Sequence, residues 1–100
     1  MNQNKKILLW LLQNGFKLNK KGIKLLVDAI EILHYNKKLK CTDIYEILAG
    51  QHETTYCAVV RAMSHAIEKD WNQTTFVKYA KNPRVFEAVK LLETLYDEWE

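Results

Sequence analysis

Apolar residues recur at intervals of three and four along most of this chain, which is the spacing of one face of an α-helix. The pattern is clearest over residues 20–36, where the apolar positions are Ile23, Leu26, Val27, Ile30 and Leu33. Only three glycines and one proline occur in 100 residues, which leaves little room for the tight turns of a β fold. The sequence therefore predicts an all-α domain.

Turn and capping residues divide the chain into six predicted helices that form one bundle. They are expected at residues 3–14, 20–36, 43–49 and 55–72, in a short segment from Thr74 or Thr75 to Ala80, and from Pro83 to the C-terminus. Gly15 and Gly50 are expected to end the first and third helices, and the predicted N-caps are Asn19, Thr42, Thr54 and Asn82. No linker or internal repeat interrupts the chain, so residues 1–100 are expected to form one domain.

The last two of the larger helices also carry apolar stripes. The helix over 55–72 is expected to bury Val59, Ala62, Met63 and Ala66, with Cys57, Arg61, Ser64 and Glu68 on its opposite face. The last helix is expected to bury Val85, Phe86, Val89, Leu92, Leu95 and Tyr96. Trp71, at the end of the 55–72 helix, is expected in the core.

A short helix over 43–49, the four-residue turn "GQHE" at 50–53 and the longer helix that follows form a helix-turn-helix outline. In such a unit the second helix presents its outer face to the major groove, which is wide enough to admit a helix. Many all-α domains contain a similar helix pair, so the outline by itself leaves the function open.

The net charge of +3 conceals an asymmetry between the two parts of the chain. Residues 1–40 carry nine lysines against Asp28 and Glu31, whereas residues 41–100 carry six basic and ten acidic residues. A lysine-rich half can contact phosphates, or it can simply form a solvated surface that keeps a small domain in solution. Both readings remain open on charge alone.

Several classes of protein are disfavoured. The two cysteines form no disulfide framework, which favours a reducing cytoplasm, and the apolar run "ILLWLL" at 7–12 is too short to span a bilayer. Ser64 and His65 are neighbours on a helix and point ~100° apart, so they cannot form a nucleophile–base pair. No ligand spacing typical of a metal site links the five candidate residues His34, Cys41, His52, Cys57 and His65. We therefore expect a non-enzymatic cytoplasmic protein without cofactor or metal.

A more specific pattern, V-x-R-A-x-x-H-A-I-E-x-x-W, runs from Val59 to Trp71. Together with Gly15, Gly22, "DAI" at 28–30 and "TT" at 54–55, it resembles the C-terminal effector domain of the sporulation stage-zero response regulator A of endospore-forming bacteria. The similarity runs without gaps from residue 6 to residue 71, and the last predicted helix resembles the family's last helix after a shortened connection. The resemblance implies a six-helix bundle that binds DNA as a transcription factor.

The same resemblance implies a set of site residues. Arg61 and His65 stand where the family has its DNA-facing Arg and His. The implied DNA-binding residues are Thr54, Thr55, Tyr56, Cys57, Ala58, Val60, Arg61, Ser64 and His65, and Lys20 and Lys21 are candidate phosphate contacts. The implied partners are double-stranded DNA and RNA polymerase or a sigma factor, with a monomer in solution that pairs head-to-tail on tandem DNA sites. The sequence begins with its own Met and carries no receiver domain, which predicts a stand-alone homologue or an excised module.

Three departures from the family's pattern lie on this helix. Ala58, Val60 and Ser64 occupy positions at which the family typically carries Arg, Glu and Arg, and each missing bidentate contact removes ~1–3 kcal/mol of base discrimination. We therefore expect an altered or weakened target specificity. The alternative is an interaction protein on the same scaffold that does not bind DNA and pairs with another regulator or an RNA polymerase subunit. The acidic second half favours this alternative, whereas the N-terminal lysines favour DNA.

Overall fold

The computed structural model describes residues 2–18 and 21–100, and over these ranges all regular secondary structure is helical. It contains α1 (Gln3–Gln13), α2 (Gly22–Tyr35), α3 (Cys41–Gln51), α4 (Tyr56–Asp70), the short 3-10 helices η1 (Trp71–Gln73) and η2 (Thr75–Lys78), and α5 (Val85–Trp99). The all-α prediction is confirmed. The predicted count of six helices is not matched exactly, because the described residues form five α-helices. The short helix predicted from Thr74 or Thr75 to Ala80 is the 3-10 helix η2, which follows η1.

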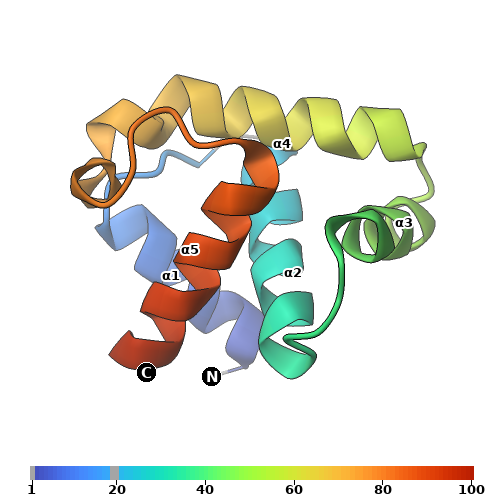
Figure 1. Cartoon of the computed structure of the whole chain (residues 1–100), viewed down its shortest axis with the longest axis horizontal. Helices are drawn as coiled ribbons and strands as arrows, with labels where there is room; N and C mark the ends of the chain where they lie inside the picture. Colours follow the sequence, from blue (N-terminus) through green and yellow to red (C-terminus); the bar gives the residue numbers. More distant parts are fainter. Residues whose placement is uncertain (1, 19–20) are drawn as a thin grey trace.

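Helix α2 lies at the centre of the bundle and contacts α1, α3, α4 and α5. Its side chains Leu26, Ala29 and Ile30 are fully buried, which explains the apolar repeat in this part of the sequence. In Figure 1, α4 runs across the top of the molecule, while α1, α2 and α5 extend beneath it and both chain ends lie at the bottom. None of the described helices combines the length and the apolar character that crossing a membrane requires.

The end of α1 is held against the 3-10 turns that follow α4. Gly15 has a φ of +113°, in the region that favours glycine, and so the predicted glycine stop is confirmed. A Cβ atom at this position would lie 2.7 Å from the carbonyl oxygen of Gln73. Next to it, the Thr75 N–H donates a hydrogen bond to the Asn14 carbonyl at 2.9 Å. The glycine thus permits both the turn and the close approach of two backbone segments.

The helix boundaries around the third helix differ from the prediction. Thr42 is not the cap and Gly50 does not end the helix: α3 begins at Cys41 and continues to Gln51. The start is set by Asp43, whose Oδ2 accepts a hydrogen bond from the Lys40 N–H at 3.1 Å. A carboxylate in the first turn is also favoured by the positive end of the helix dipole.

The turn into α4 spans His52 to Thr55. The cap of α4 is Thr55 rather than the predicted Thr54, because it is the Thr55 Oγ1 that accepts a hydrogen bond from the Ala58 N–H at 3.1 Å. Val59, Met63 and Ala66 are buried as predicted, with Ala62 half-buried beside them. Asn19, the predicted cap of the helix over 20–36, lies outside the described residues.

Trp71 is buried in the core as predicted, and its indole N–H donates a hydrogen bond to the Ala80 carbonyl at 2.8 Å. This contact closes the segment that carries η1 and η2. The Thr74 Oγ1 accepts a hydrogen bond from the Phe76 N–H at 3.2 Å, so Thr74 caps the second of these turns. The buried Phe76 then packs beside Trp71, with 5.9 Å between ring centroids.

Helix α5 begins later than the sequence suggested. Asn82 does not cap it and Pro83 is not its first residue, since Asn82 has a φ of +48° and the cap is Arg84. The Arg84 N–H donates a hydrogen bond to the Glu87 Oε1 at 3.1 Å, and this interaction sets the start. Of the predicted stripe, Val89, Leu92 and Tyr96 are buried, whereas Val85, Phe86 and Leu95 are only half-buried.

Candidate nucleic-acid interface

The first turns of α4 stand at the surface of the molecule. Cys57, Ala58 and Arg61 are exposed, whereas Val59 and Met63, on the opposite side of the helix, have no exposed surface. One side of α4 is therefore fixed by the core while the other faces solvent. This division follows directly from the spacing of the apolar residues.

The outermost line of α4 is formed by Cys57, Arg61 and His65, which are spaced by four residues and are all exposed. We call these three residues the outer line. Arg61 forms no ion pair within residues 2–18 and 21–100, so pairing with Glu68 does not occupy its guanidinium. A guanidinium in this position offers a planar set of hydrogen-bond donors to a ligand.

On one flank of α4, Thr54 and Ala58 line a hollow of about 220 Å³ between α4 and the start of α2. The other residues of this hollow are Lys21, Lys24, Leu25, His52 and Ala62. We call it the lysine hollow. The predicted phosphate contact Lys21 thus lies beside the predicted recognition helix, while Lys20 lies outside the described residues. Lys24 was missed by the sequence analysis, although its spacing of three from Lys21 on one helix would have indicated it.

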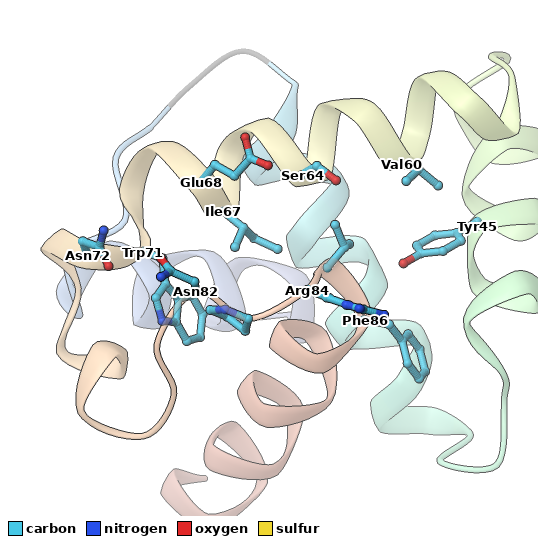
Figure 2. A pocket seen from close by; sticks show the side chains of 12 residues that line it. Tyr45, Val60, Ser64, Ile67, Glu68, Trp71, Asn72, Asn82, Arg84 and Phe86 are labelled. Carbon is cyan, nitrogen blue, oxygen red and sulfur yellow. The ribbon is translucent and has the colours of Figure 1, made fainter.

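The opposite flank of α4 borders a groove of about 550 Å³ between α4, Tyr45 and the start of α5, shown in Figure 2. Val60 and Ser64 line this groove and are half-buried. Its remaining walls are mainly apolar and come from Ile67, Trp71, Pro83, Val85 and Phe86, with Glu68, Asn72, Asn82 and Arg84 as polar members. We call it the α4–α5 groove. Two of the predicted DNA-binding residues are therefore turned toward α5 rather than outward.

Tyr56 packs against α3. Its ring meets the buried Tyr45 ring edge-on, with 5.4 Å between centroids, and leaves 37% of the residue exposed. Burial raises the pKa of Tyr45 to about 12, with smaller contributions from Cys41 and Tyr56. This tyrosine pair joins the first turn of α4 to α3.

A cluster of charged groups ties α2 to α5 at the end of the molecule away from α4 (Figure 1). His34 Nδ1 lies 3.2 Å from Glu93 Oε2 and 3.7 Å from Asp97 Oδ1, an arrangement of groups that also occurs in metal sites. The Lys37 ammonium, however, lies 3.0 Å from Glu93 and 3.4 Å from Asp97. Its hydrogen bond to Glu93 raises the pKa of Lys37. The carboxylates are therefore already paired with a cation of the chain itself.

Comparison with models of known protein families, with curated proteins and with solved structures found no match. The relation to the sporulation regulator rests on the residue pattern between Val59 and Trp71 and on the matching glycines and threonines. It remains a resemblance.

Proposed function

We propose that this protein is a transcriptional regulator that binds double-stranded DNA by placing α4 in the major groove. The observation that carries the proposal is the exposed outer line of α4, with the lysine hollow directly beside it. At the centre of this line is the Arg61 guanidinium, which has no ion-pair partner in the part of the chain that the structure describes. Arg presents two donors to the O6 and N7 atoms of guanine, which is the commonest specific base contact in the major groove.

The charge distribution supports this proposal. Asp97 and Glu98 belong to the last turn of α5 and Glu100 follows it. This end of α5 lies at the bottom of Figure 1, whereas α4 lies at the top. The lysines of the hollow lie next to α4 instead. The acidic second half of the sequence therefore does not place its C-terminal charges next to the proposed DNA contact, where they would repel phosphates.

The specificity that we propose is weak or altered relative to the family that the sequence resembles. The outer line carries a single guanidinium, Ala58 has no polar side chain, and Ser64 is turned into the α4–α5 groove. Few side chains are thus available to form hydrogen bonds with base edges, whereas phosphate contacts give affinity without sequence discrimination. By the same resemblance, we propose a monomer in solution that pairs head-to-tail on tandem sites and contacts RNA polymerase or a sigma factor.

A second candidate function is supported by the α4–α5 groove. Its largely apolar walls and its volume of about 550 Å³ suit the binding of an apolar peptide segment. On this alternative the protein would act by holding another regulator or a polymerase subunit in the groove, without contacting DNA.

Binding to random duplex DNA across a salt series separates the two candidates. The DNA-binding proposal predicts that the logarithm of the binding constant falls linearly with the logarithm of salt concentration, by about 0.9 per neutralised phosphate. If no binding to duplex is measurable even at low salt, the DNA-binding proposal is wrong and the interaction protein is the better account.

A further inference from the structure

The lysine hollow is built from two elements that are distant in sequence. Lys21 and Lys24, at the start of α2, form one wall, and Ala58 and Ala62 of α4 form the other. Both lysines are exposed, and neither forms an ion pair within residues 2–18 and 21–100. The hollow therefore brings two uncompensated positive charges to the side of α4.

A carboxylate on the same helix as Lys24 is already engaged. Asp28, one turn after Lys24 on α2, has its Oδ2 2.7 Å from His52 Nε2, and its Oδ1 accepts a hydrogen bond from the Asn4 amide at 2.7 Å. The Asp28 carboxylate therefore interacts with His52 and Asn4 rather than with Lys21 or Lys24. His52 lines the hollow, with its ring held by Asp28.

The two alanines explain why there is a hollow at all. Both face the lysines from α4, and a longer side chain at either position would fill the space between the helices. The hydroxyl-bearing Thr54 closes the end of the hollow just before the cap of α4. The result is a concave site with two cations, a hydroxyl group and one wall of small alanine side chains. Such a site suits a compact anion with oxygen acceptors.

We propose that the lysine hollow holds one phosphate group of the DNA backbone, on the strand that borders α4 when this helix lies in the major groove. Lys21 and Lys24 compensate the phosphate charge, and the small side chains of Ala58 and Ala62 allow the backbone to approach. The inference rests on the proposed function and adds to it the group that sets the register of α4 on the duplex.

The test compares Lys21→Gln and Lys24→Gln with the matched control Lys38→Gln, in duplex binding measured across a salt series. Lys38 is an exposed lysine in the segment between α2 and α3, and the end of α2 that leads into this segment lies away from α4 (Figure 1). The salt slope is the steepness with which the logarithm of the binding constant falls against the logarithm of salt concentration. Each hollow variant should reduce this slope by about one. It should also weaken binding to all sequences alike, roughly five- to tenfold at 0.1 M salt. Lys38→Gln should change neither quantity. If wild-type protein binds with a steep salt slope and the hollow variants retain it, the hollow does not hold a phosphate although the protein binds DNA.

A second measurement identifies the group that is bound. Duplexes that carry a single neutral methylphosphonate are scanned along each strand with wild-type protein and with Lys24→Gln. One position should weaken wild-type binding severalfold and have little further effect on Lys24→Gln, because the same contact is lost in both. If every position weakens both proteins by equal factors, the inference is overturned. If wild-type protein does not bind duplex at all, the proposed function itself fails.

Discussion

His52 Nε2 lies 2.7 Å from Asp28 Oδ2, and this contact ties the turn between α3 and α4 to α2. The other carboxylate oxygen of Asp28 accepts the hydrogen bond from Asn4 on α1. The side chains of His52 and Asp28 are 24% and 17% exposed. One carboxylate therefore joins three parts of the bundle at the base of the proposed recognition helix.

Replacing Asp28 with Ala should lower the free energy of unfolding by about 1–3 kcal/mol, because the half-buried His52 loses its partner and the half-buried Asn4 amide keeps only its hydrogen bond to Glu31. Urea unfolding measures this loss. The matched control is Glu46→Ala, which removes an exposed carboxylate from α3 and should change stability by less than about 0.5 kcal/mol. Equal effects of the two substitutions would show that the Asp28 contacts do not stabilise the turn.

Gly15→Ala should destabilise the protein by more than about 2 kcal/mol. The φ of +113° is strained for any residue with a Cβ atom, and this atom would lie 2.7 Å from the Gln73 carbonyl oxygen, where the backbone must move. Gly50 provides the control within the same chain, since it lies inside α3 and a Cβ there meets nothing within 4 Å. Gly50→Ala should stabilise the protein by about 0.5–1 kcal/mol. Thermal unfolding should show a lower melting temperature for Gly15→Ala and a higher one for Gly50→Ala than for wild type. If Gly15→Ala leaves stability unchanged, the account of the turn after α1 is wrong.

The faces of the helices could be predicted from the sequence more accurately than the residues at which the helices start. The intervals of three and four between apolar residues reveal which segments form helices and which faces they bury, as for Val59 and Met63 of α4. The residue types expected at a cap predict where each helix starts. In α3 and α5 the starts depend instead on Asp43 and Glu87, whose carboxylates accept hydrogen bonds from the backbone of the cap residue.

The site was predictable to a smaller extent, because its geometry depends on contacts between distant segments. The helical repeat indicates that Arg61 is exposed, but it does not indicate what lies on either flank of α4. Ser64 faces the groove because α5 starts beside it, and Ala58 faces lysines because α2 starts on the other side. Neither relation is encoded in the local sequence around α4.

Stability should fall in alkaline solution through two tyrosines. Burial raises the pKa of Tyr45 and of Tyr96 to about 12, whereas a tyrosine of the unfolded chain titrates near 10. Between about pH 10 and pH 12 the unfolded state therefore loses protons that the folded state retains, and the stability that is present below pH 10 is lost as the pH rises. Urea unfolding at several pH values should show a smaller decline for Tyr45→Phe and Tyr96→Phe than for wild type. An identical decline in all three proteins would contradict the burial argument.

The central claim is that α4 reads DNA through Arg61. The most direct measurement is fluorescence anisotropy of duplexes selected by the wild-type protein from a random pool, titrated with Arg61→Ala and with Arg84→Ala. Arg61 and Arg84 are the only arginines of the chain, and Arg84 lies on the α4–α5 groove rather than on the outer line. We expect Arg61→Ala to weaken the selected site by ~1–3 kcal/mol and to remove the preference at one base pair, while Arg84→Ala binds as wild type does. If Arg61→Ala binds the selected site with unchanged affinity and unchanged preference, α4 does not read DNA through Arg61.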